Sequence, residues 1–247
     1  MQDRQGLATR VFPSDRPVDL PPVLLLHGIA SSGNGDWVEP GTVSALNDAG
    51  RTVVVVDLRG HGDSPAPASA AETGAPAQAQ DILAALDGVG VETFDIAGYS
   101  LGARLAWAVA EEAPARVRKV VLGGLSPVEP FSMVDIAALR KAVAEGVQPE
   151  DPFTGMIAGL VGSRGPEHAP GLALVVEGLA STPFEPKAWP VQTPPVFVVG
   201  QDDMMTQGIE RIVDLVGGAE LITVPGDHFG ALAGAEFRGT VVRALGQ

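Results

Sequence analysis

Short runs of consecutive apolar residues alternate along the chain with longer amphipathic stretches. The apolar runs cover residues 23–26, 52–56, 94–97, 117–122, 195–199 and 220–224. Such continuous runs predict strands buried on both faces of a parallel sheet, rather than half-solvated antiparallel strands. The amphipathic stretches have the length of crossover helices and cover residues 36–48, 75–87, 101–112, 207–216 and 232–245. The pattern therefore predicts an α/β fold with a mostly parallel central sheet and helices on both faces.

The alternation breaks between residues 126 and 190, where proline and glycine separate short helical pieces at residues 133–144 and 172–179. We expect this segment to form a small helical lid inserted over the sheet, with residues 1–125 and 191–247 forming the core. An ordinary run of helices within the domain is the alternative. A chain of 247 residues can bury one sizeable core, so no second independent domain is required.

Composition and charge exclude several classes of function. The formal net charge of -14 and the pI of about 4.5 disfavour nucleic acid as a partner, because affinity for phosphates depends on Lys and Arg. No stretch approaches the roughly 18 apolar residues that a membrane-spanning helix needs. Residues 1–10 are polar and contain no apolar signal-peptide core, so the expected compartment is the cytoplasm.

The sequence contains no cysteine, which excludes disulfides, a thiol nucleophile and thiolate metal sites. We expect a protein that acts on a small-molecule substrate without a metal ion or other cofactor. The sequence gives no indication of the oligomeric state.

The segment 94–102 reads Phe-Asp-Ile-Ala-Gly-Tyr-Ser-Leu-Gly, an apolar strand that runs into a G-x-S-x-G turn and then a helix. A serine on so sharp a turn needs neighbours without bulk, which Gly98 and Gly102 supply. The turn places the Ser100 hydroxyl at a helix N-terminus, where the backbone N–H of Leu101 can stabilise developing negative charge. A tight strand-to-helix turn without catalysis is the alternative, but the flanking strand and helix favour a nucleophile.

A serine hydroxyl needs a general base, and histidine is the side chain best suited to that task near neutral pH. The chain has four histidines, at positions 27, 61, 168 and 228. His228 directly follows the last apolar run, so it can reach the same edge of the sheet as Ser100. His228 is therefore the predicted base.

An acid is needed to orient the imidazole and to stabilise its protonated form. Asp202 and Asp203 follow the run 195–199 and complete the chain order Ser, Asp, His. Glu129, after the preceding strand, is a further alternative.

The nucleophile turn and this residue order resemble the α/β-hydrolase superfamily over nearly the whole chain. In that family the acid often occupies the fourth position of a Gly-x-x-Asp turn, which implies Asp203 in the segment 200–203. The family's second oxyanion donor follows a His-Gly pair. By that resemblance the backbone N–H of Ile29 acts beside that of Leu101.

Two further features of the resemblance are interpreted as structural. His27, in the His-Gly pair, is expected to brace its loop rather than to transfer protons. The segment 57–64 resembles the family's turn after the next strand, and Asp57 and Arg59 are expected to fix that turn.

Within the superfamily, Ser100 stands where relatives resembling haloalkane dehalogenases and epoxide hydrolases use an aspartate. Epoxide opening also depends on lid tyrosines, whereas the single tyrosine here is Tyr99, inside the turn. The resemblance therefore implies a carboxylesterase-like serine hydrolase. It would cleave an ester, thioester or lactone of a small, mainly apolar substrate through an acyl-enzyme intermediate.

Two alternatives remain open from the sequence. Arg104 follows the turn, as in the similar elbow of the menaquinone-pathway synthase that eliminates pyruvate, which would imply a carbon–carbon hydrolase or lyase. The simpler interpretation is that Arg104 is a solvated or paired residue in the first helical turn. The second alternative is a ligand receptor that has the same fold and no catalysis.

Overall fold

The computed structural model describes residues 6–246. The predicted core bounds also include residues 1–5 and 247, and the interpretation of residues 1–10 depends in part on residues 1–5. These positions lie outside the described residues.

Seven strands form one sheet in the described chain, in the order β1-β3-β2-β4-β5-β6-β7. They are β1 (Thr9–Phe12), β2 (Val23–Leu26), β3 (Val53–Val56), β4 (Phe94–Tyr99), β5 (Val117–Gly123), β6 (Val196–Gly200) and β7 (Glu220–Val224). All neighbouring pairs are parallel except β1 with β3. The six predicted strands and the mostly parallel sheet are confirmed, but burial on both faces is wrong for β7, which lies at the edge of the sheet and is only partly buried. The antiparallel edge strand β1 was not predicted, because it has only four residues, two of them polar, and none of them is fully buried.

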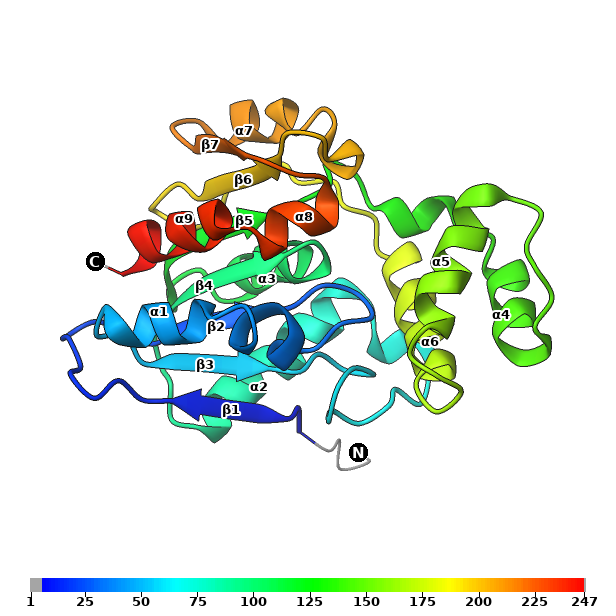
Figure 1. Cartoon of the computed structure of the whole chain (residues 1–247), viewed down its shortest axis with the longest axis horizontal. Helices are drawn as coiled ribbons and strands as arrows, with labels where there is room; N and C mark the ends of the chain where they lie inside the picture. Colours follow the sequence, from blue (N-terminus) through cyan, green and yellow to red (C-terminus); the bar gives the residue numbers. More distant parts are fainter. Residues whose placement is uncertain (1–5, 247) are drawn as a thin grey trace.

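Helices cover both faces of the sheet, as predicted (Figure 1). They are α1 (Thr42–Asp48), α2 (Ala75–Gly88), α3 (Leu101–Glu112), α7 (Glu210–Val216), α8 (His228–Ala233) and α9 (Ala235–Leu245). Alternate residues of a strand point to opposite faces. Leu24 and Leu26 accordingly pack in the core that holds α2 and α3, whereas Val23 and Leu25 pack in the core that holds α1 and α9.

Two predicted helices are interrupted. The stretch 36–48 divides into a short π-helix, η1 (Asn34–Val38), and α1, because Pro40 and Gly41 intervene and Gly41 has a φ of 83°. The stretch 232–245 is divided at Gly234, which ends α8 in extended backbone and begins α9. In addition, α7 starts three residues later than predicted. Glycine and proline explain the two interruptions, whereas the later start of α7 has no such explanation.

The segment between β5 and β6 contains η3 (Pro130–Met133), α4 (Ile136–Glu145), α5 (Pro152–Gly162) and α6 (Ala169–Ala180). Figure 1 shows α4, α5 and α6 grouped beyond one end of the sheet. Side-chain contacts identify it as the carboxyl end, since Arg164 bonds Ala30 after β2 and Thr73 after β3 bonds Leu174. That this segment acts as a lid stays a prediction.

Helix α5 was missed because three glycines and Pro152 read as punctuation, yet Pro152 occupies the first turn, where it needs no N–H donor. The η2 turn (Ala70–Glu72) and the η4 turn (Met204–Thr206) are single 3₁₀ turns. None of the helices described is long and apolar enough to cross a membrane.

Candidate active site

Ser100 lies on the sharp turn between β4 and α3. Its backbone has φ 55° and ψ −115°, and it is one of two described non-glycine residues with positive φ, the other being Ala30. An L-residue adopts such a conformation only where the surroundings enforce it, and this kind of strain is concentrated at functional sites. Its N–H donates to the carbonyl oxygen of Gly123 at 2.8 Å, which fixes the turn against β5.

The two glycines around Ser100 are required by close backbone contacts. A Cβ atom on Gly98 would lie 2.1 Å from the carbonyl oxygen of Gly102. A Cβ atom on Gly102 would lie 2.0 Å from the carbonyl oxygen of Leu26, at the end of the adjacent strand β2. The prediction that both positions must lack bulk is confirmed.

His228 lies within hydrogen-bond distance of two sequence-predicted site residues. Its Nε2 is 2.9 Å from Oγ of Ser100, and its Nδ1 is 2.8 Å from Oδ2 of Asp203. A carboxylate oxygen accepts, so Nδ1–H donates to Asp203 and Nε2 is left to accept the Ser100 hydroxyl hydrogen. Oδ1 of Asp203 also accepts the N–H of Met205 at 2.9 Å, which orients the carboxylate. The structure thus brings Ser100, His228 and Asp203 into one hydrogen-bonded line.

The two alternative acids lie elsewhere. Asp202 is exposed, beside the buried Asp203. Glu129 is buried and lies 3.5 Å from Nε of Arg104, and burial raises the pKa of its carboxyl from 4.5 to about 7. Of these three acids, Asp203 is the one that contacts His228.

The loop after β2 lies against the turn at Ser100. A Cβ atom on Gly28 would lie 3.7 Å from Cβ of Ser100, and the Gly28 N–H donates to Oδ2 of Asp36 at 2.8 Å. Within residues 6–246, no protein acceptor takes the backbone N–H of Ile29 or of Leu101. Both predicted oxyanion donors are therefore available to an added group.

His27 braces this loop, as predicted. Its Nδ1–H donates to the carbonyl oxygen of Gly28 at 2.8 Å, and its Nε2 accepts the N–H of Leu58 at 2.9 Å. Full burial lowers the pKa of its imidazole, which keeps the ring neutral. Both ring nitrogens are engaged with backbone, so His27 has no free position for proton transfer.

The turn after β3 is held by Asp57 and Arg59, which confirms their predicted structural role. Asp57 accepts the backbone N–H groups of Gly33 at 2.8 Å and Asp63 at 3.1 Å. Arg59 pairs with Asp81 at 2.5 Å. Among the described residues, no group of three or more His, Asp or Glu side chains is arranged to hold a metal ion.

Arg104 is a paired residue in the first turn of α3, which agrees with the simpler of its two interpretations. Its guanidinium lies 3.5 Å from the carboxylate of Glu129 and 4.7 Å above the ring of Phe184. Burial lowers its pKa, while the charge of Glu129 acts in the opposite direction.

Two contacts near the site were not predicted. The hydroxyl of Tyr99 donates to the carbonyl oxygen of His228 at 2.7 Å, and burial raises the pKa of that hydroxyl. Arg164, from the segment between β5 and β6, donates through Nε to the carbonyl oxygen of Ala30. Both bonds join residues far apart in the chain, so no local sequence pattern indicates them.

The fold and the strained turn at Ser100 are those expected from the resemblance, and the comparison of sequences agrees on the family. The sequence profile of the alpha/beta hydrolase fold family matches residues 21–144, just over half of the chain. The chain therefore belongs to the α/β-hydrolase family, as the resemblance implied.

Two curated relatives are similar to part of the chain. An sn-1-specific diacylglycerol lipase of Mus musculus is 32% identical over 115 residues, which are 46% of this chain and 36% of the lipase. Epoxide hydrolase 3 of Siraitia grosvenorii is 34% identical over 101 residues, 41% of this chain and 31% of that protein. The match thus spans about a third of the length of these relatives.

A solved structure is similar over nearly the whole chain. The enol-lactonase from Burkholderia xenovorans LB400 superposes with a TM-score of 0.77 at 21% identity, over 98% of this chain and 96% of the lactonase. This similarity establishes the shared fold.

Proposed function

We propose that the chain is a serine hydrolase that cleaves a carboxylic ester, thioester or lactone of a small, mainly apolar substrate. The observation that carries the proposal is the hydrogen-bonded line from Ser100 through His228 to Asp203, with Ser100 on a strained turn at a helix N-terminus. In this proposal Ser100 is the nucleophile, His228 the general base and Asp203 the acid that orients it.

The geometry supports an acyl-enzyme mechanism. Oγ of Ser100 attacks the acyl carbon while its proton passes to Nε2 of His228, 2.9 Å away. The imidazolium is stabilised by the carboxylate of Asp203 and then donates its proton to the leaving alcohol or thiol. Water, deprotonated by His228, attacks the ester bond to Ser100 and releases the acid.

The tetrahedral oxyanion would be held by the backbone N–H groups of Ile29 and Leu101. Neither group has a protein acceptor within the described residues, and the Gly28 loop lies beside Ser100. One such donor is worth about 3 kcal/mol of transition-state stabilisation in other serine hydrolases.

We also propose that residues 126–190 act as a lid that selects the substrate. Helix α6 and the residues before it meet the loops after β2 and β3, at the edge of the sheet where Ser100 lies. The three proposed reacting groups lie outside this segment, so it would select the substrate without supplying a reacting group. The cytoplasm stays a prediction for the compartment.

The names of the similar proteins bear on the substrate in different ways. A lipase and an enol-lactonase act on esters and lactones, which agrees with the proposal. The similarity to an epoxide hydrolase does not carry that activity here, because Ser100 stands at the nucleophile position. In addition, epoxide opening depends on lid tyrosines, and the hydroxyl of the single tyrosine, Tyr99, donates instead to the carbonyl oxygen of His228.

Of the alternatives, the resemblance that suggested carbon–carbon cleavage involved Arg104. This residue pairs with Glu129 at 3.5 Å and lies over the ring of Phe184, although its Nε and Nη1 have no hydrogen-bond partner among the described residues. A ligand receptor has no need of the strained backbone at Ser100. Both observations favour the serine hydrolase.

The test is the intact mass of the protein after exposure to a fluorophosphonate, followed by a panel of short and medium acyl esters. Ser100→Ala is the test variant, and Ser69→Ala, at an exposed serine, is the matched control. We expect one adduct on the wild-type and Ser69→Ala proteins and none on Ser100→Ala. A folded wild-type protein that forms no adduct and hydrolyses no ester would favour the receptor.

A further inference from the structure

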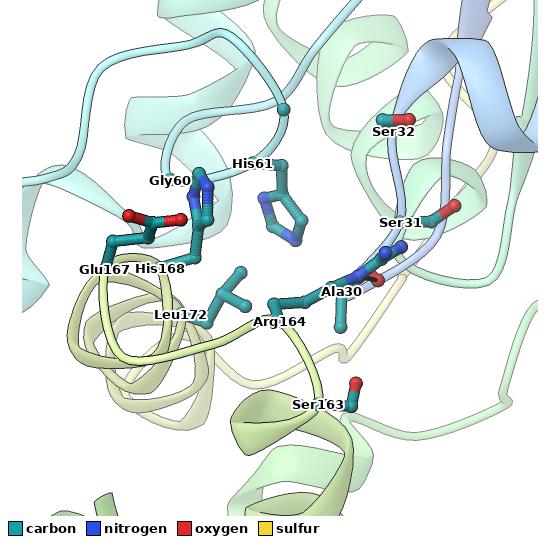
Figure 2. A pocket seen from close by; sticks show the side chains of 11 residues that line it. Ala30, Ser31, Ser32, Gly60, His61, Ser163, Arg164, Glu167, His168 and Leu172 are labelled. Atoms are coloured by element: carbon teal, nitrogen blue, oxygen red, sulfur yellow. Dashed lines mark hydrogen bonds between the residues drawn. The ribbon is translucent and has the colours of Figure 1, made fainter.

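A cavity of about 330 Å³ lies between the loops after β2 and β3 and the start of α6. Figure 2 shows its walls, with residues 30–32 on one side, residues 60–62 on another and residues 163–172 opposite. In open α/β sheets, ligands bind outside the carboxyl ends of the strands, which is where this cavity lies. None of the residues proposed for the chemical step lines it.

His61 presents an unpaired acceptor to the cavity. The side chain is 2% exposed, and its Nδ1–H donates to the carbonyl oxygen of Arg59 at 3.1 Å. Its Nε2 is buried and has no partner among the described residues. Burial holds the pKa of the ring well below its usual range, so Nε2 carries a lone pair rather than a proton. In Figure 2 the ring points into the space between Arg164 and His168.

Arg164 presents donors to the same cavity. Its Nε is bonded to the carbonyl oxygen of Ala30, and no described residue accepts from its terminal nitrogens. Glu167 also lines the wall, so the lining contains one cationic and one anionic side chain besides the histidines. The cavity therefore offers an acceptor and a donor without a strong excess of either charge.

The cavity adjoins the proposed oxyanion loop. Ala30, in its wall, follows Ile29, and consecutive Cα atoms are about 3.8 Å apart. The proposal requires that a group attached to an ester held at Ser100 and Ile29 extends past Ala30 into the cavity.

We propose that this cavity is a substrate subsite that receives a hydroxyl group, which donates to Nε2 of His61 and accepts from Arg164. A hydroxyl group fits because it is both donor and acceptor, whereas a carboxylate cannot donate to Nε2 and an ammonium group would face Arg164. The inference rests on the proposed serine hydrolase and narrows its substrate class. The substrate is a small, mainly apolar ester or lactone that carries a hydroxyl group on its acyl or its alcohol part.

The test compares two matched pairs of esters. For the acyl part, the pair is para-nitrophenyl butanoate and para-nitrophenyl β-hydroxybutanoate. For the alcohol part, it is propyl butanoate and glyceryl monobutanoate. A site that bonds a substrate hydroxyl discriminates against the analogue without it, because its polar groups are left unpaired. We expect kcat/KM for the hydroxylated member of one pair to exceed that of its partner by about 10- to 100-fold.

The variants His61→Leu and His61→Gln separate the acceptor from the fold of the turn. Both lose the Nδ1–H bond to Arg59, but the amide oxygen of Gln can accept where Nε2 did. His61→Leu should reduce the preference to near one, and His61→Gln should keep most of it. Asp63→Asn, at an exposed position of the same turn, is the control and should keep the full preference. Equal hydrolysis within both pairs, or a preference that survives in His61→Leu, would overturn the proposal.

A binding measurement distinguishes failure of the subsite from failure of the hydrolase. The chain has four histidines, so a long-range proton–nitrogen NMR spectrum of the Ser100→Ala protein can resolve each imidazole. Glyceryl monobutanoate or methyl β-hydroxybutanoate should shift the Nε2 resonance of His61 saturably, and their counterparts without the hydroxyl should not. If the fluorophosphonate test fails but this shift occurs, the subsite stands and the hydrolase does not. If neither hydroxylated ester causes a shift, only water occupies the cavity and the subsite is wrong.

Discussion

The hydroxyl of Tyr99 donates a hydrogen bond of 2.7 Å to the backbone carbonyl oxygen of His228. Tyr99 directly precedes Ser100, and its ring centroid lies 5.4 Å from that of His228 and 5.1 Å from that of Phe237. The residue next to the proposed nucleophile therefore holds the backbone of the proposed base. This contact fixes the distance between two segments that are 129 positions apart in the chain.

The Tyr99→Phe variant tests this contact. It keeps the ring packing and removes the donor, which should lower the free energy of unfolding by about 1 kcal/mol. We also expect kcat to fall roughly 3- to 10-fold with little change in KM, because His228 gains freedom relative to Ser100. Phe237→Leu is the control, since it disturbs the same packing and leaves the hydrogen bond. An unchanged kcat in Tyr99→Phe would show that the contact is structural only.

Replacement of the two neighbouring aspartates separates the proposed acid from an exposed carboxylate. Asp203→Asn should lower kcat/KM by about 10³- to 10⁴-fold, because an amide can fix the wrong imidazole tautomer and does not stabilise the imidazolium. Asp202→Asn should change kcat/KM less than about threefold, since Asp202 is exposed and does not contact His228. Steady-state kinetics on a simple ester provide the comparison. Equal losses in the two variants would contradict the assignment.

The turn at Ser100 has no room for a side chain at Gly98. Gly98→Ala places a methyl group 2.1 Å from the carbonyl oxygen of Gly102, so the turn must shift or the protein must unfold. We expect a loss of at least about 3 kcal/mol of stability and no fluorophosphonate adduct. Gly159→Ala is the matched control, because an added Cβ in α5 meets nothing within 4 Å and favours the helix. Thermal denaturation of the two variants side by side gives the result.

The parallel sheet was predictable because each buried strand is a continuous apolar run, as in β2 and β3, whose residues are all fully buried. The edge strand β1 was not, because two of its four residues are polar, whereas the other edge strand, β7, was predicted although its residues are only partly buried. Helix α3 was located correctly, whereas α5 was missed because its glycines and Pro152 suggested a loop. Sequence pattern thus predicts a strand where consecutive residues are apolar, whether or not both of its faces are buried.

The site was predictable where local sequence dictates local geometry. Gly98 and Gly102 indicated the turn at Ser100, and the position of His228 after the last apolar run indicated the base. The chain order left Asp202 and Asp203 open, and the family resemblance implied Asp203. The contacts of Tyr99 with His228 and of Arg164 with Ala30 were not predictable, because each depends on how distant segments pack. The same holds for the pair of Arg104 and Glu129, which the sequence separates by 25 positions.

Glu129 is buried beside Arg104, and ionisation of its carboxyl group opposes folding. Desolvation raises the pKa of its carboxyl from 4.5 to about 7, although the charge of Arg104 acts to lower it. The folded state therefore holds this proton more tightly than the unfolded state between those pH values. Stability falls as pH rises wherever the folded state binds more protons, so this group lowers the stability progressively from about pH 4.5 to about pH 7. A difference of that size corresponds to roughly 3 kcal/mol.

The Glu129→Gln variant removes the titration and keeps the shape of the side chain. We expect its free energy of unfolding to change less with pH than that of the wild type between pH 5 and pH 8, so that the variant gains up to about 3 kcal/mol relative to the wild type over this range. Urea denaturation of both proteins at several pH values gives the two curves. The ion pair with Arg104 exists only when Glu129 is ionised, so its attraction is already contained in the pKa of about 7. The difference in slope between the two curves therefore carries the test. Parallel curves would mean that Glu129 is ionised at all these pH values and that its pairing with Arg104 outweighs its desolvation.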